Sequence, residues 1–129
     1  AHPPAGIVGA LAGAREAWPH LRILAVFQPH RFTRVRDLLD DFARAFHDAS
    51  QVVVCPVYRA GERPIDGLDE ASIGTRIVSY GHRSVHVVQD LDEATTHLIA
   101  QSEPGDIIIT LGAGDVNRVC TDLAEALRG

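Results

Sequence analysis

The sequence contains no lysine and no methionine, and all twelve of its basic residues are arginine. The absence of lysine excludes a phosphate-loop lysine, a Schiff-base lysine and a carbamylated lysine from the chemistry of these 129 residues. Any reaction of ATP that needs such a residue must take it from another part of a longer chain. Because methionine is missing, residue 1 is not a native translation start, and we expect the chain to be a fragment of a larger protein.

Cysteine and long apolar runs are also scarce, and the charge balance is mildly acidic. Cys55 and Cys120 lie far apart in apolar stretches, a pattern that does not fit a zinc site and favours two buried free thiols over a disulfide. The histidines are scattered without metal-ligand spacing, and no Gly-x-Ser-x-Gly elbow occurs, so we expect neither a metal site nor a hydrolase triad. No apolar run approaches the roughly 18 residues of a membrane span, which favours a soluble, cytoplasmic domain without a membrane partner. The net charge of -5 disfavours a nucleic-acid partner.

Apolar residues make up 46% of the chain, which is enough for a folded core, and the length fits one domain over residues 1–129. Hydrophobic periodicity predicts one helix followed by four strand–helix pairs. The predicted strands are 22–27, 51–55, 85–88 and 106–111, and the predicted helices are 4–17, 35–46, 70–80, 91–100 and a last one through 127. This alternation predicts the α/β class, as a three-layer, Rossmann-like open and mostly parallel sheet with helices on both faces.

Local signals place the helix ends and the inward helix faces. Thr33, Asp69 and Asp90 precede helical patterns and are predicted N-caps, because their side chains accept hydrogen bonds from free backbone N–H groups. Val78 and Ile99 continue apolar patterns, and we expect both to face the core.

Residues 28–34, Gln-Pro-His-Arg-Phe-Thr-Arg, lie where the first predicted strand passes into a helix. In an open α/β sheet ligands bind at this edge, and a helix N-terminus favours an anion. Arg31 and Arg34 are three residues apart, which puts two guanidinium groups on one helix face. Such groups bind carboxylates and phosphates in bidentate fashion, so the stretch predicts an anion clamp. The alternative is a solvated first turn whose arginines pair with acidic neighbours, Asp37, Asp40 or Asp41.

Two further strand-to-helix connections meet the same edge of a parallel sheet. Residues 57–68 form a long irregular loop, whose tyrosine, glutamate and two arginines are candidates to face a ligand: Tyr58, Glu62, Arg59 and Arg63. A solvated flap is the alternative. The last strand runs directly into a turn of four residues, Gly112, Ala113, Gly114 and Asp115. Its glycines permit close approach of a ligand, and its aspartate can cap the next helix. A tight turn with a cap explains the same residues equally well.

Residues 26–34 resemble a motif in the C-terminal domain of the Mur ligase family, in the branch that adds L-alanine. Three other segments agree with this resemblance, in order along the chain. Ala1 and His2, followed by Pro4 and Ile7, are similar to the tail of the family's Tyr-x-His-His-Pro-x-x-Ile opening. Two later segments, residues 57–65 and residues 109–115, are similar to its Val-Tyr-x-Ala-Gly-Glu-x-Pro-Ile loop and to its strand with Gly-Ala-Gly-Asp.

The resemblance implies an ATP-dependent ligase of three domains. The first domain would bind the UDP part of the substrate, the central one would hold ATP and magnesium, and this third one would close over the cleft. The implied reaction belongs to bacterial peptidoglycan precursor synthesis and joins the carboxylate of UDP-N-acetylmuramate to the amine of L-alanine through an acyl phosphate. The implied partners are these substrates, ATP, and the central and N-terminal domains of the same parent chain. The isolated domain is expected to be inactive.

The catalytic residues that the resemblance implies are His30, Arg31 and Arg34. The arginines would position and neutralise the lactyl carboxylate or its acyl phosphate, with the histidine beside them as a hydrogen-bond donor. His2, Tyr58 and Glu62 are expected to bind substrate. The glycine turn, residues 112–115, would line the nucleotide or amino-acid side of the cleft.

The sequence departs from the family pattern at three positions. Pro3 replaces the second histidine of the opening segment, Gly6 replaces a glutamate, and Pro56 replaces the aspartate before Val-Tyr. Two carboxylates and an imidazole are thus missing near the expected cleft, which leaves a divergent ligase, a relative with another amino acid, and a non-catalytic copy as alternatives. A stand-alone module that binds an anion or a nucleotide sugar, and a non-catalytic interaction domain, are the other functions that fit the residues.

Overall fold

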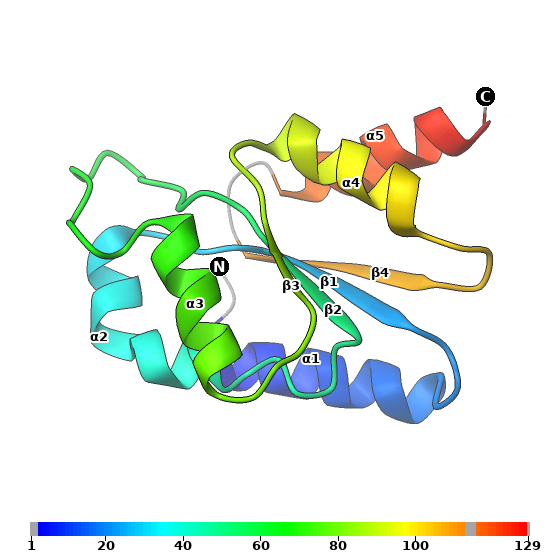
Figure 1. Cartoon of the computed structure of the whole chain (residues 1–129), viewed down its shortest axis with the longest axis horizontal. Helices are drawn as coiled ribbons and strands as arrows, with labels where there is room; N and C mark the ends of the chain where they lie inside the picture. The colour runs from blue at the N-terminus through cyan, green and yellow to red at the C-terminus, as the bar shows by residue number, and fades with distance from the viewer. Residues whose placement is uncertain (1–2, 113–115, 129) are drawn as a thin grey trace.

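A computed structural model describes residues 3–112 and 116–128 of the chain (Figure 1). Its strands are β1 (Ile23–Gln28), β2 (Gln51–Val54), β3 (Val85–Val87) and β4 (Ile107–Gly112). Its helices are α1 (Pro4–Ala17), α2 (Phe32–Ala43), α3 (Glu70–Ser79), α4 (Leu91–Gln101) and α5 (Asn117–Arg128). One helix followed by four strand–helix pairs is the order that the sequence predicts.

The strands form one sheet in the order β3-β2-β1-β4, and every described pairing is parallel. β1 lies between β2 and β4, and all six of its residues are buried. Its side chains alternate between two hydrophobic clusters, with Ile23, Ala25 and Phe27 in one and Leu24 and Val26 in the other. Burial on both faces is why this strand is a continuous apolar run in the sequence.

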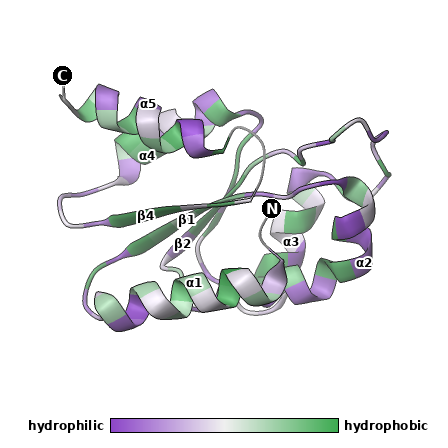
Figure 2. Ribbon diagram, turned by 180° about the vertical axis from the view of Figure 1, so that it is seen from behind, coloured by the Kyte–Doolittle hydropathy of each residue, from purple (hydrophilic) through white to green (hydrophobic). Residues whose placement is uncertain are grey.

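Helices cover both faces of the sheet. α1, α2 and α3 pack on the face of Phe27, and α4 and α5 pack on the face of Val26 (Figure 1). Figure 2 shows hydrophobic residues along the strands, whereas the helices divide between hydrophobic and hydrophilic residues. The predicted three-layer α/β architecture is therefore confirmed. In the described part of the chain, no helix combines the length and the apolar character needed to cross a lipid bilayer.

Both cysteines are free thiols, as predicted. Cys55 follows β2 and is fully buried in the cluster beneath α4 and α5. Burial raises the pKa of its thiol to about 12. Cys120 lies in α5 and is only half-buried, so the prediction that both thiols are buried holds for Cys55 alone.

Helix α2 differs from its prediction at both ends. Arg31 occupies the N-cap position and Thr33 lies inside the helix, so the predicted cap is wrong. The helix ends at Ala43, and a kink interrupts it at Leu38, whose φ of -122° and ψ of 18° are not helical. The prediction located the helix start from a capping side chain, but no side chain at the N-cap position makes that hydrogen bond.

Two residues predicted to face the core are exposed. The exposed fractions of Val78 and Ile99 are 52% and 45%. Each follows a residue that is buried against the sheet, Ile77 in α3 and Leu98 in α4. Because neighbouring side chains on a helix point in directions about 100° apart, only one of each adjacent pair packs inward.

The strand order reverses at β1, since β2 and β3 lie on one side of it and β4 lies on the other. At this reversal Gln28 pairs with Gly112. Gly112 has a φ of 135°, and a Cβ atom there would collide with the backbone oxygen of Gln28, so only glycine fits. In doubly wound sheets ligands bind in the crevice beside such a reversal. The rest of the predicted turn, Ala113, Gly114 and Asp115 with its cap, lies outside the described residues.

Candidate functional site

Residues 28–34 connect β1 to α2 and are held in place by the loop that follows β2. The Tyr58 N–H donates to the Pro29 carbonyl at 2.7 Å, and the Arg31 N–H donates to the Tyr58 carbonyl at 2.8 Å. The rings of His30 and Tyr58 stack with their centroids 5.6 Å apart. Strand-like pairing thus continues past the end of the sheet, and two connections predicted to share an edge lie side by side.

The backbone is strained in both of these connections. Arg31 has a φ of 64° and Ala60 a φ of 51°, and within residues 3–112 and 116–128 no other residue except glycine has a positive φ. Such conformations cost about 1–3 kcal/mol each and persist only where the surroundings impose them. For Arg31 the imposing contact is the hydrogen bond from its N–H to Tyr58. Strain concentrated at one sheet edge marks this edge as the candidate site.

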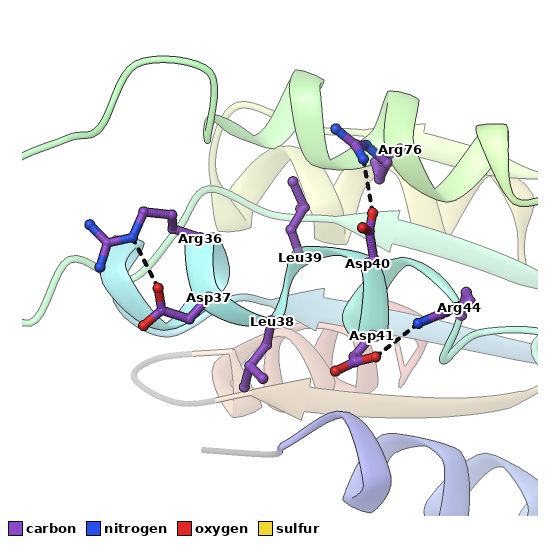
Figure 3. A pocket seen from close by; sticks show the side chains of 8 residues that line it. All are labelled: Arg36, Asp37, Leu38, Leu39, Asp40, Asp41, Arg44 and Arg76. Atoms are coloured by element: carbon purple, nitrogen blue, oxygen red, sulfur yellow. Dashed lines mark hydrogen bonds and ion pairs between the residues drawn. The ribbon is translucent and has the colours of Figure 1, made fainter.

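Arg31 and Arg34 form no ion pair with any acidic residue that the structure describes. The three aspartates considered as partners pair with other arginines (Figure 3): Asp37 with Arg36 at 3.0 Å, Asp40 with Arg76 at 2.8 Å, and Asp41 with Arg44 at 3.0 Å. The self-neutralised first turn is therefore absent from the described chain. No described acidic side chain neutralises either guanidinium group.

Three polar atoms in the same stretch are buried and have no hydrogen-bond partner in the described chain: Gln28 Oε1, His30 Nδ1 and Arg34 Nε. Buried polar atoms are normally paired, so this cluster indicates a partner that residues 3–112 and 116–128 do not supply. Burial, and then the positive charge of Arg31, lowers the pKa of His30. Its ring is therefore neutral at pH 7 and carries one N–H donor and one acceptor nitrogen.

An open pocket of about 750 Å³, which we call the anion pocket, is lined by His30, Arg31, Thr33, Arg34, Asp37 and Leu38. Its two unpaired guanidinium groups and its neutral imidazole suit an oxyanion with several acceptor oxygens, such as a carboxylate or a phosphate. Gln28 ends β1, two residues before His30. A polar residue that ends an otherwise apolar strand is the sequence signal for Gln28.

Glu62 places its carboxylate at the N-terminus of α2. The Thr33 hydroxyl donates to Oε2 at 2.6 Å, and the Thr33 N–H donates to Oε1 at 3.2 Å. The side-chain hydrogen bond from Thr33 is the main cause of the lowered pKa of Glu62. The sequence does not predict this contact, because Glu62 fits a ligand-binding residue and Thr33 fits an N-cap.

The structure brings five of the predicted site residues together. His30, Arg31 and Arg34 line the anion pocket, and Tyr58 and Glu62 contact the same stretch from the loop after β2. Gly112 ends the neighbouring strand. The other predicted residues, His2, Ala113, Gly114 and Asp115, lie outside the described residues. Within the described ranges, no three His, Cys, Asp or Glu side chains gather in a way that suits a metal ion.

Comparison with known proteins gives one consistent family. The family described as "Mur ligase, glutamate ligase domain" matches residues 1–114. The chain is 45% identical over 122 residues to the UDP-N-acetylmuramate–L-alanine ligase of Desulfosudis oleivorans, which covers 95% of this chain and 27% of that protein. It is 46% identical over 126 residues to the enzyme of the same name from Novosphingobium aromaticivorans, covering 98% and 26%. The chain thus spans about a quarter of the length of these curated relatives.

Solved structures agree with this assignment. The UDP-N-acetylmuramate–alanine ligase of Thermotoga maritima superposes with a TM-score of 0.78 and 26% identity, over 99% of this chain and 25% of that one. A murein peptide ligase from Psychrobacter arcticus shares the fold, with a TM-score of 0.74 and 20% identity over 98% of this chain and 26% of that one. The resemblance first noted at residues 26–34 is confirmed by the family match. The chain belongs to the Mur ligase family, as its C-terminal, glutamate ligase domain.

Proposed function

We propose that this chain is the cleft-closing domain of an ATP-dependent ligase that joins L-alanine to UDP-N-acetylmuramate. The observation that carries the proposal is the pair of unpaired cations, Arg31 and Arg34, beside the neutral ring of His30 in the anion pocket. The relatives named for this reaction, at 45% and 46% identity, supply the choice of substrates. The anion pocket of this chain thus supports the chemistry, and relatives about four times as long supply the substrates.

The proposed role of the anion pocket follows from charge. A carboxylate that attacks the γ-phosphorus of ATP becomes an acyl phosphate as ADP leaves, and the amine then attacks the carbonyl carbon and releases phosphate. Negative charge is present on the reacting oxygens throughout. Arg31 and Arg34 would hold and neutralise it, and His30 would donate a hydrogen bond to the same group. Charges fixed in place before the reaction are an effective source of rate in phosphoryl transfer.

ATP and magnesium are proposed to bind mainly outside this chain. The chain has no lysine for a phosphate loop. Its described residues also offer no group of three metal-binding side chains. We therefore assign both to a central domain and the UDP group to an N-terminal domain of the parent protein. The use of ATP and a nucleotide-linked sugar acid places the proposed reaction in the cytoplasm.

The test uses the full-length protein that carries this domain, assayed for phosphate release that requires ATP, UDP-N-acetylmuramate and L-alanine together. We expect Arg31→Ala and Arg34→Ala each to lower kcat/KM by about 100-fold, as removal of a charge-stabilising group typically does. Arg44→Ala is the matched control, because it removes an exposed arginine at the other end of the same helix, and neither Arg44 nor its partner Asp41 lines the anion pocket. It should leave kcat/KM within about twofold of the wild type.

The outcomes separate the ligase from its alternative. An active wild type whose Arg31→Ala and Arg34→Ala variants keep full activity would refute the role of the anion pocket. A wild type without L-alanine-dependent activity would refute the ligase. Titration of the 129-residue chain with UDP-N-acetylmuramate then tests a stand-alone anion or nucleotide-sugar module, which requires binding that Arg34→Ala abolishes.

A further inference from the structure

We propose that Glu62 is a positioning residue, whose carboxylate caps α2 from the neighbouring loop and so fixes the two arginines of the anion pocket. The inference rests on the proposed function, since it assigns Glu62 a part in that reaction without contact with the reacting atoms. It replaces the expectation that Glu62 binds substrate, because Thr33 donates a hydrogen bond to each of its carboxylate oxygens.

The first step of the argument is that α2 lacks a cap of its own. In α3 the N-cap Asp69 accepts the Ser72 N–H at 2.8 Å, and in α4 the N-cap Asp90 accepts the Glu93 N–H at 2.7 Å, as the sequence predicts. The N-cap residue of α2 is Arg31, whose side chain makes no such bond. The free N–H groups of a helix start need an acceptor, so α2 depends on one from elsewhere.

The second step is that Glu62 supplies this acceptor at the turn that carries both arginines. It binds Thr33 through the N–H and through the hydroxyl. Thr33 lies between Arg31, which starts the turn, and Arg34, which follows directly in it. The Val35 N–H donates to the Arg31 carbonyl at 3.1 Å and closes the turn. Fixing Thr33 therefore fixes the backbone from which both guanidinium groups extend.

The third step is that Glu62 is itself held in place. Its N–H donates to the Arg59 carbonyl at 2.9 Å, and Arg59 Nε donates to the Glu62 carbonyl at 3.2 Å. Between them Ala60 has a positive φ of 51°, which tightens the loop. On the other side Tyr58 pairs with the backbone of residues 29–31. The loop and the start of α2 thus form one hydrogen-bonded unit.

The fourth step concerns charge. A helix N-terminus attracts an anion, and two cations beside it are unfavourable unless an anion is near. Glu62 is that anion, and the Thr33 hydrogen bond together with the positive charge of Arg31 holds its pKa low. Asp37, which also lines the pocket, is paired with Arg36, so the two cations and the carboxylate of Glu62 leave a net positive charge. The helix end is therefore satisfied internally, and the arginines remain for the substrate.

The test compares two caps that have the same chemistry in different places. In the full-length ligase, Glu62→Ala removes the cap of the helix that bears the arginines, and Asp69→Ala removes the cap of α3, which bears no site residue. We expect Glu62→Ala to lower kcat by about tenfold or more with little change in KM for UDP-N-acetylmuramate, because misplaced catalytic groups lose transition-state contacts. Asp69→Ala should leave kcat within about twofold of the wild type. It should lower Tm by about as much as Glu62→Ala does, because each variant loses one helix cap.

A second pair of variants tests the hydrogen bond itself. Thr33→Val removes the hydroxyl that donates to Glu62 and should lower kcat, as Glu62→Ala does. Thr33→Ser keeps the hydroxyl and should keep kcat near the wild-type value. Hydrogen exchange at the Thr33 and Val35 amides of the same proteins reports the order of the turn without reference to activity. Both amides should exchange faster in Glu62→Ala than in Asp69→Ala.

The outcomes distinguish this inference from the proposed function. An active wild type whose Glu62→Ala variant keeps its kcat would overturn the positioning role. An equal loss of kcat in Glu62→Ala and Asp69→Ala would show that general destabilisation, and not positioning by Glu62, causes the loss. A rise in KM alone would return Glu62 to direct substrate binding. A wild type without ligase activity refutes the proposed function, and amide exchange unchanged by Glu62→Ala refutes the cap.

Discussion

Gly112 is the residue at which a single added methyl group decides whether β1 and β4 can end side by side. Its φ is 135°, and a Cβ atom would meet the backbone of Gln28. Backbone strain and a collision with main-chain atoms add together here. We therefore expect Gly112→Ala to lower the free energy of unfolding by about 3 kcal/mol, measured by urea denaturation of the chain.

The control for Gly112→Ala is Gly67→Ala. Gly67 also has a positive φ, of 81°, but an added Cβ would meet nothing within 4 Å. That substitution carries backbone strain alone and should cost about 1 kcal/mol. Equal losses in the two variants would show that the approach of β4 to Gln28 is not under steric constraint.

At the same scale, the sequence identifies the residues that bear charge but not those that hold them in place. Arg31 and Arg34 are predictable because cations at a strand-to-helix junction are a local signal. The bond between Thr33 and Glu62 joins residues 29 positions apart, and several acidic residues of the chain would satisfy the same local pattern. The positive φ of Arg31 is equally hidden, because arginine ordinarily avoids that conformation.

At the scale of elements, β3 and α4 meet through a pair of histidines. The rings of His86 and His97 stack with centroids 3.8 Å apart, and His97 Nε2 lies 3.0 Å from the Gln51 side-chain oxygen. Burial, and then electrostatic repulsion from His86, lowers the pKa of His97. Two stacked imidazoles resist being charged together, so this contact is stable when His97 is neutral.

This contact predicts that stability falls as the pH falls through the ordinary histidine pKa of about 6.5. In the range between the ordinary histidine pKa of 6.5 and the lowered value, the unfolded chain binds a proton at His97 and the folded chain does not. Protonation therefore favours the unfolded state. The measurement is the free energy of unfolding across this range, and His97→Gln should reduce its slope.

The control separates His97 from other titrating groups. The pKa of His30 is also lowered, so His30→Gln should reduce the slope independently. The lowered pKa values of Asp69 and Asp106 belong to carboxyl groups, whose stabilisation is lost only at lower pH, as the pH falls below about 4. A His97→Gln variant with the wild-type slope would contradict the prediction.

Helix starts differ in how far the sequence predicts them. Asp69 and Asp90 are confirmed as N-caps because an acidic residue before a periodic segment is a complete local signal. Thr33 fits the same pattern but is wrong as a cap, because α2 begins one residue before it and takes its acceptor from the loop. A cap supplied across space leaves no trace in the helix's own sequence.

At the scale of the whole molecule, the alternation of helix and strand predicts a parallel sheet covered on both faces, and this is confirmed (Figure 1). The alternation does not give the order β3-β2-β1-β4. It therefore does not say that the reversal falls between β1 and β4, beside Gln28. That position depends on which face each crossover helix takes, and both faces accept similar apolar stripes.

The alkylation rate of Cys55 reports how often the sheet opens. The thiolate is the form that alkylating reagents attack, and a fully buried thiol with a pKa of about 12 offers almost none. In a Cys120→Ser variant, alkylation of Cys55 should therefore proceed only when the sheet opens, slower than for an unfolded thiol by about 10⁴-fold or more for a domain of ordinary stability. Iodoacetamide labelling followed by mass spectrometry measures this alkylation rate. Labelling at the unfolded rate would mean that the end of β2, where the site's loop begins, opens by itself.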